Sequence, residues 1–91
     1  SSLPNNSYTL EKGNPCLTNI RSPTGSSVQV LEVDGSGTGD IIADRQEVIV
    51  TGRNDTDRGV IFGITDLNGY ELGWVRDYNL ASVSVNCPYH K

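Results

Sequence analysis

The sequence has 91 residues, a formal net charge of −4 and 35% hydrophobic residues, which suits one small domain with a modest core. Ten glycines, four prolines and no methionine point to frequent turns and to a core of Val, Ile, Leu and a few aromatic residues. The acidic charge with scattered Lys and Arg argues against nucleic acid and anionic lipid as partners, and no apolar stretch approaches the roughly 18 residues of a membrane span.

Residues 1–15 are polar and contain two prolines, which is typical of a tail or linker. The alternative is an extra edge strand over residues 8–10. We expect the folded domain to cover residues 16–87 and a short C-terminal tail to follow over residues 88–91. The first residues lack the charged and apolar regions of a signal peptide.

Several short runs alternate apolar and polar residues or are rich in β-branched residues, as strands are. These runs cover residues 17–21, 28–33, 46–52, 59–65, 70–75 and 81–85. Between these runs, turn residues fill 22–27 and 53–58, and residues 34–40 form a glycine-dense loop. Asn68-Gly69 predicts a hairpin, and residues 76–80 predict a 3-10 turn. Helical spacing never persists for three turns. From these six runs we predict an all-β chain with five main short strands in a small barrel or sandwich.

Cys16 and Cys87 stand near the two ends of the patterned region. Two cysteines are too few for a structural zinc site, which takes four ligands. They form either a disulfide or two free buried thiols. A disulfide would close a loop of roughly 70 residues and stabilise the domain by about 4 kcal/mol, and it would favour an oxidising compartment.

The chain resembles a bacterial SH3-type domain in two short motifs. Asn19-Ile20-Arg21-Ser22 matches the family's opening pattern N-[VI]-R-S. Gly73-Trp74-Val75 and Leu80 match its closing pattern G-W-V-x-x-x-[YF]-L after an Asn-Gly hairpin, although the tyrosine, Tyr78, falls one place early. The resemblance covers residues 17–83. It implies a five-stranded SH3-like barrel with a long glycine-rich loop and one 3-10 turn.

In such a barrel the first and last strands pair, so Cys16 and Cys87 would lie close enough for a disulfide. The A-L-Y-D-Y motif of eukaryotic SH3 domains is missing, which argues against recognition of proline helices. Residues 59–62 also lack the aromatic pattern that the family often has there.

Trp74 is the single tryptophan of the sequence, and two interpretations of it are open. It packs into the core under the long loop, or it lines a shallow groove. In the second case Tyr70 and Tyr78 line the groove too, with Arg21 and Arg76 at its rim, because aromatic residues beside arginine are typical of binding hot spots.

Catalytic and metal-binding patterns are weak. Asp34, Ser36, Thr38 and Asp40 resemble the start of a calcium-binding loop, but Arg45 stands where the bidentate glutamate belongs. The sequence holds a single histidine, at position 90 near the C-terminus. We therefore expect no enzyme, no cofactor and no metal site, and leave calcium binding by residues 34–40 open.

These features predict an extracytoplasmic, monomeric binding module, periplasmic, attached to the cell wall or secreted. The resemblance implies a cell-wall peptide or an envelope protein as its partner. The alternative is a structural spacer of a larger cell-envelope protein, with residues 1–15 as its linker and no ligand of its own.

Overall fold

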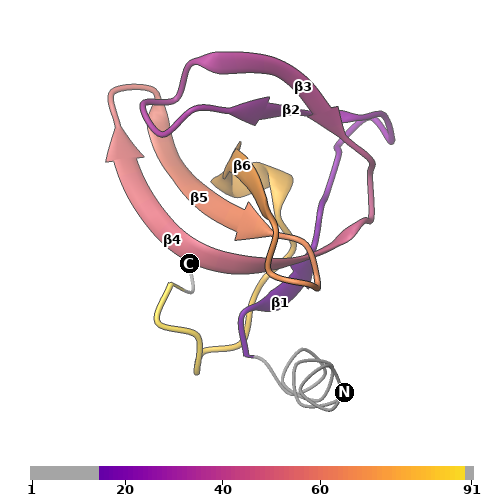
Figure 1. Cartoon of the computed structure of the whole chain (residues 1–91), viewed down its shortest axis with the longest axis vertical. Coiled ribbons are helices and arrows are strands. Elements are labelled where there is room, and N and C mark those ends of the chain that lie inside the picture. Colours follow the sequence, from indigo (N-terminus) through magenta and orange to yellow (C-terminus); the bar gives the residue numbers. More distant parts are fainter. Residues whose placement is uncertain (1–14, 90–91) are drawn as a thin grey trace.

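The computed structural model describes residues 15–89, and over this range the chain consists of strands and one short 3-10 turn (Figure 1). The elements in chain order are β1 (Leu17–Asn19), β2 (Val28–Leu31), β3 (Gly37–Ile42), β4 (Glu47–Thr56), β5 (Gly59–Thr65), β6 (Glu71–Arg76) and η1 (Asp77–Asn79). The expectations for residues 1–14, including the alternative strand at 8–10, and for His90 lie outside the described residues. No helix within residues 15–89 is long and apolar enough to cross a membrane.

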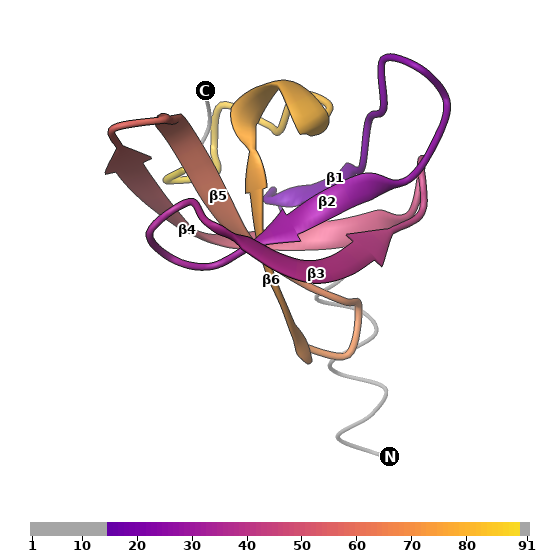
Figure 2. The ribbon, with the colours of Figure 1, turned by 90° about the horizontal axis from the view of Figure 1, so that it is seen from above.

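The strands of the described region form one antiparallel sheet in the order β1-β4-β5-β6-β2-β3. The sheet curls into a half-barrel, with β4 and β5 along one side and β2 and β3 across the other (Figure 1). Figure 2 shows that β6 runs steeply across β2, and the two strands meet at the pair Leu31–Trp74. The curl gives the sheet a concave side that shields apolar residues from water.

The core combines residues from β2 to β6 with residues from both ends of the domain. Phe62 is the largest of its fully buried side chains. The other buried members are Cys16, Ile20, Val28, Val30, Ile42, Val48, Ile49, Val50, Ile64, Val75, Leu80 and Cys87. These are aliphatic or aromatic residues and the two cysteines, as the composition predicts.

Residues 15–89 contain six strands rather than the expected five, because β3 begins inside the predicted glycine-dense loop. β2 and β3 pair on both sides of a bulge, and the Thr38 hydroxyl donates a hydrogen bond of 3.0 Å to the Val30 carbonyl oxygen there. Gly39 has a φ of 90°, which glycine adopts without a steric penalty. Gly39 therefore lies within a strand, whereas Gly35, with a φ of 91°, stays in the turn before it.

The predicted polar turn over residues 53–58 is mostly strand. β4 continues to Thr56 because Arg53 and Asp55 pair with Phe62 and Val60 of β5. The Thr56 hydroxyl closes the hairpin by donating a hydrogen bond of 2.8 Å to the Gly59 carbonyl oxygen. The prediction mistook the polar end of a long hairpin for a loop.

The predicted strand over residues 81–85 is wrong. Leu80 forms an isolated bridge with Ile20, and the Ala81 amide donates to the Asn19 carbonyl oxygen at 3.0 Å, but residues 81–85 form no regular strand. The reason is the shortness of β1, whose three residues offer too small an edge for a five-residue partner. Val85 is accordingly 76% exposed.

Cys16 and Cys87 form the expected disulfide, with their Cα atoms 4.9 Å apart. Both are buried in the core cluster, and Tyr89 packs against that cluster from beyond the bridge. The Ser84 amide also donates to the Pro15 carbonyl oxygen at 3.2 Å. A buried disulfide of this kind is typical of proteins from oxidising compartments outside the cytoplasm.

We predict that replacing both cysteines, Cys16→Ser with Cys87→Ser, lowers the free energy of unfolding by about 4 kcal/mol, because the unfolded chain regains the entropy of an open loop. Urea unfolding followed by circular dichroism measures the change. Reductant should destabilise the native protein and leave the double variant unaffected. Equal unfolding midpoints for the native protein and the variant would contradict the prediction.

Candidate functional site

Trp74 lies on the face of β6 that points away from the core. Its neighbour Val75 is fully buried in the core cluster, and adjacent residues of a strand point to opposite faces. Trp74 is half-buried and pairs with Leu31 on one side and with Gly63 on the other. Trp74 therefore lies outside the main core. This excludes the first of the two interpretations, in which the residue packs into the core.

The indole of Trp74 rests on two glycines. A Cβ atom at Gly63 would lie 3.3 Å from both Cη2 and Cζ2 of the indole, and one at Gly52 would lie 3.4 Å from Cη2. Gly52 and Gly63 are directly paired in the sheet, so together they make a flat seat for the ring. A methyl group at Gly63 would therefore push the indole away from the sheet, whereas one at Gly52 would just touch the ring.

Arg76 lies two residues beyond Trp74, on the same face of β6, and is half-buried opposite Ile61. Leu31 and Ile61 are each 1% exposed, although neither belongs to the main core cluster. The outer face around Trp74 thus carries a small apolar cluster of its own.

Tyr70 and Tyr78 are 73% and 58% exposed and lie at opposite ends of β6. The six residues of β6 between them span about 20 Å. Arg21 belongs to the Tyr78 end, since its amide donates to the Asn79 carbonyl oxygen at 2.8 Å. The five predicted binding residues therefore follow the whole length of β6, and Arg21 and Tyr70 line two different hollows.

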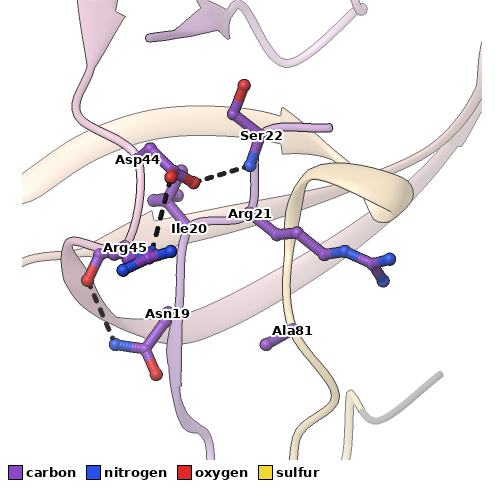
Figure 3. Close-up of a pocket in the computed structure, with 7 residues that line it drawn as sticks. All are labelled: Asn19, Ile20, Arg21, Ser22, Asp44, Arg45 and Ala81. Carbon is purple, nitrogen blue, oxygen red and sulfur yellow. Dashed lines mark hydrogen bonds and ion pairs between the residues drawn. The ribbon is translucent and has the colours of Figure 1, made fainter. Parts of the chain in front are cut away.

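The first hollow, called here the arginine hollow, has a volume of about 470 Å³ (Figure 3). It lies where the chain leaves β1, where it enters β4 and where it follows η1. It is lined by Asn19, Ile20, Arg21, Ser22, Asp44, Arg45 and Ala81. Arg21 was predicted from the sequence as a binding residue, whereas Arg45 was not.

The acidic residue of this hollow is already engaged. The Ser22 amide donates a hydrogen bond of 2.8 Å to Oδ1 of Asp44, and Nε of Arg45 lies 3.7 Å from Oδ2 (Figure 3). The Asp44 side chain is 20% exposed, while that of Arg45 is 91% exposed. The Arg45 guanidinium thus remains largely open to solvent.

Arg45 has an unusual backbone, with a φ of 69°, and no other non-glycine residue within 15–89 has a positive φ. For an L-residue this conformation costs roughly 1–2 kcal/mol. The Arg45 amide donates to the Ile20 carbonyl oxygen at 2.8 Å, and its own carbonyl oxygen accepts from Nδ2 of Asn19 at 3.2 Å. These two hydrogen bonds hold the strained turn in place.

The second hollow, called here the Tyr70 hollow, has a volume of about 390 Å³ and is more apolar. It is lined by Val30, Asp40, Ile41, Ile42, Ala43, Gln46, Tyr70, Glu71 and Leu72. Ile41 is 69% exposed beside the exposed ring of Tyr70. Ile41 was not predicted from the sequence, although two consecutive isoleucines on one strand require that one of them points outward.

The two hollows adjoin each other at the turn before β4. Ala43 and Gln46 line the Tyr70 hollow, whereas Asp44 and Arg45, which lie between them in the chain, line the arginine hollow. One side of this turn therefore offers apolar surface and the other offers guanidinium groups.

The stretch that resembles a calcium loop forms the turn between β2 and β3 and the first residues of β3. Ser36 donates two hydrogen bonds to Oδ1 of Asp34, from its amide at 2.9 Å and from its hydroxyl at 2.7 Å. The Thr38 hydroxyl bonds to Val30 and accepts from the Asp40 amide at 3.1 Å. Within the described residues no three His, Cys, Asp or Glu side chains gather as a metal site would require.

No known protein family, curated protein or solved structure matches this chain significantly. The arrangement of its own residues therefore carries the functional argument.

We predict that Gly63→Ala lowers the free energy of unfolding by about 1 kcal/mol, because the added methyl group displaces the indole of Trp74. Tryptophan fluorescence and urea unfolding report the displacement and its cost. Gly52→Ala is the matched control, because its methyl group would make ordinary contacts with two ring atoms, at 3.4 and 3.9 Å, and should cost less.

Repeating the Gly63→Ala change in a variant without the indole tests whether the ring causes the loss of stability. In a Trp74→Ala background, Gly63→Ala should lose most of its effect, since the ring that it crowds is gone. An equal loss of stability with and without Trp74 would show that Gly63 is needed for another reason.

The hydrogen bonds from Ser36, first from its hydroxyl and then from its amide, hold the pKa of Asp34 below its usual value. A carboxyl whose pKa is lowered on folding adds stability above its unfolded pKa, and this contribution is lost as the pH falls through the folded pKa. Ser36→Ala should therefore raise the pKa of Asp34, as followed by NMR titration of the carboxyl carbon. An unchanged pKa would contradict the assigned cause.

Proposed function

We propose that this chain is a non-catalytic, extracytoplasmic binding module of the bacterial SH3 type, which recognises a cell-wall peptide or a protein of the cell envelope. The proposal is supported by the way the two motifs meet. Ile20 of the first motif bridges Leu80 of the second, and Nδ2 of Asn79 donates to the Arg21 carbonyl oxygen at 3.1 Å. The curled antiparallel sheet and the 3-10 turn after β6 agree with such a barrel.

The proposed docking site for a peptide is the Tyr70 hollow, and the observation that carries the proposal is that the exposed residues Ile41 and Tyr70 both line it. Two large apolar side chains that face solvent beside a hollow favour contact with a partner, because such contact removes their surface from water. Tyr70 also supplies a hydroxyl at the rim, as tyrosines at binding surfaces often do.

The chemistry of the chain supports a binding role over catalysis. Both cysteines of the sequence are joined in the disulfide, and the single histidine stands at position 90. The linings of the two hollows therefore include no cysteine nucleophile and no histidine base. The disulfide supports an extracytoplasmic location, and the acidic net charge argues against nucleic acid as the partner.

A structural spacer is the second candidate, and one observation favours it. Within residues 15–89 every buried side-chain nitrogen and oxygen has a hydrogen-bond partner, so no buried polar group is left for a ligand to satisfy. A spacer needs only a stable fold and a polar surface.

We predict that soluble peptidoglycan fragments shift the NMR amide signals of Ile41, Ala43 and Leu72. Tyr70→Ala should weaken binding by about tenfold, equivalent to about 1.4 kcal/mol, because it removes the exposed ring from the contact. Tyr78→Ala is the matched control, since this tyrosine is also exposed but lies beyond the other end of β6.

The titration separates the two candidate functions. If Tyr78→Ala abolishes binding of the fragments and Tyr70→Ala does not, the binding site lies at η1, and the proposed location is wrong. No shift anywhere with fragments at millimolar concentration would favour the spacer over recognition of cell-wall peptide.

A further inference from the structure

The apolar residues that line the Tyr70 hollow are of two kinds. Val30 and Ile42 are buried members of the core cluster, and Leu72 packs against that cluster. Ile41 and Tyr70 also line the hollow but are largely exposed. The hollow therefore offers apolar surface both from the core and from exposed side chains, which suits an aliphatic part of a ligand.

The charged residues that line the Tyr70 hollow are all of one sign. Asp40 and Glu71 are exposed and line the hollow, whereas none of the described residues in its lining is Lys, Arg or His. Asp66 adds a third carboxylate nearby, since its Oδ1 accepts a hydrogen bond of 2.9 Å from the Tyr70 amide. These charges give the hollow a negative potential, which attracts a cation.

Neither carboxylate of this lining is neutralised by a cation of residues 15–89. The carboxylates that form ion pairs within this range are those of Asp44 and Asp55. Arg45 follows the lining residue Ala43 closely in the chain, but its Nε lies 3.7 Å from Oδ2 of Asp44, in the arginine hollow. Both carboxylates of the Tyr70 hollow are therefore open to a positively charged group of a ligand.

We infer that the Tyr70 hollow binds a peptide side chain that ends in an ammonium group, such as that of lysine. This inference rests on the proposed function, since it names the part of the peptide that the same hollow recognises. The aliphatic stem of the side chain covers apolar surface of Ile41 and Leu72, while its ammonium group stays in water beside Asp40 or Glu71. The ring of Tyr70 favours the same group, because the face of an aromatic ring attracts a cation.

The test compares two short peptides that differ in one ammonium group. N-acetyl-alanyl-lysyl-alaninamide and its twin with norleucine in place of lysine share the aliphatic stem and have no charged terminus. The lysine peptide should shift the NMR amide signals of Ile41, Ala43 and Leu72 and bind about fivefold more tightly than the twin, which is the size expected for exposed ion pairs. Added salt should weaken binding of the lysine peptide, because it screens exposed charges, but not binding of the twin.

Two double variants assign the interaction to the carboxylates of the hollow. Asp40→Asn with Glu71→Gln should weaken binding of the lysine peptide about fivefold and leave binding of the norleucine peptide unchanged. Asp55→Asn with Asp57→Asn is the matched control, since it removes the same number of charges at the end of the β4–β5 hairpin and should change neither affinity. All four side chains are exposed, so the substitutions should preserve the fold.

The outcomes separate this inference from the proposed function. Equal affinity for the two peptides, or full binding of the lysine peptide by Asp40→Asn with Glu71→Gln, would overturn the inference. If neither short peptide shifts any signal while peptidoglycan fragments still shift those of Ile41 and Leu72, the inference is wrong and the proposed function stands. If the lysine peptide binds through the two carboxylates and the fragments do not bind, the inference is confirmed and only the proposed cell-wall ligand is wrong.

Discussion

The two ends of the domain meet at β1, and the rest of the fold depends on this contact. Ile20 bridges Leu80, and the Thr18 hydroxyl donates to the Ala81 carbonyl oxygen at 2.9 Å. The disulfide between Cys16 and Cys87 joins the same ends across a separation of 71 residues. Because β1 has three residues, its few hydrogen bonds alone would close the sheet weakly, and the covalent bond compensates by restricting the unfolded chain. The arginine hollow forms at this closure, because Ile20 and Ala81 from the two ends both line it.

Tight backbone contacts decide where side chains can go on the outer face. Gly52 and Gly63 leave room for the indole of Trp74, which would otherwise be pushed off the sheet. Nearby, Asn54 donates to the Val33 carbonyl oxygen and so ties the β2–β3 turn to the β4–β5 hairpin. A small domain with one modest core gains from such a second, outer cluster, because it buries apolar surface on both faces of the sheet.

The sequence predicted some of the residues of the candidate site by their type, but it did not predict how they are arranged in space. Arg21 and Tyr70 were predicted, yet they line different hollows, because β6 places Tyr70 and η1 at its opposite ends. Arg45 was missed because its importance depends on a positive φ that arises from a turn anchored to Ile20. Ile41 was missed because its exposure depends on its position on the edge strand β3.

Alternation of apolar and polar residues, together with the turn residues, was enough to establish an all-β chain, the β5–β6 hairpin and the 3-10 turn. These features depend on neighbours in the chain, which local propensity describes. Only the tertiary structure decided that residues 37–42 join the sheet and that residues 81–85 do not, because pairing requires a partner edge of sufficient length. It also decided on which face Trp74 lies and which charged groups meet in a hollow, since both follow from contacts between residues far apart in the sequence.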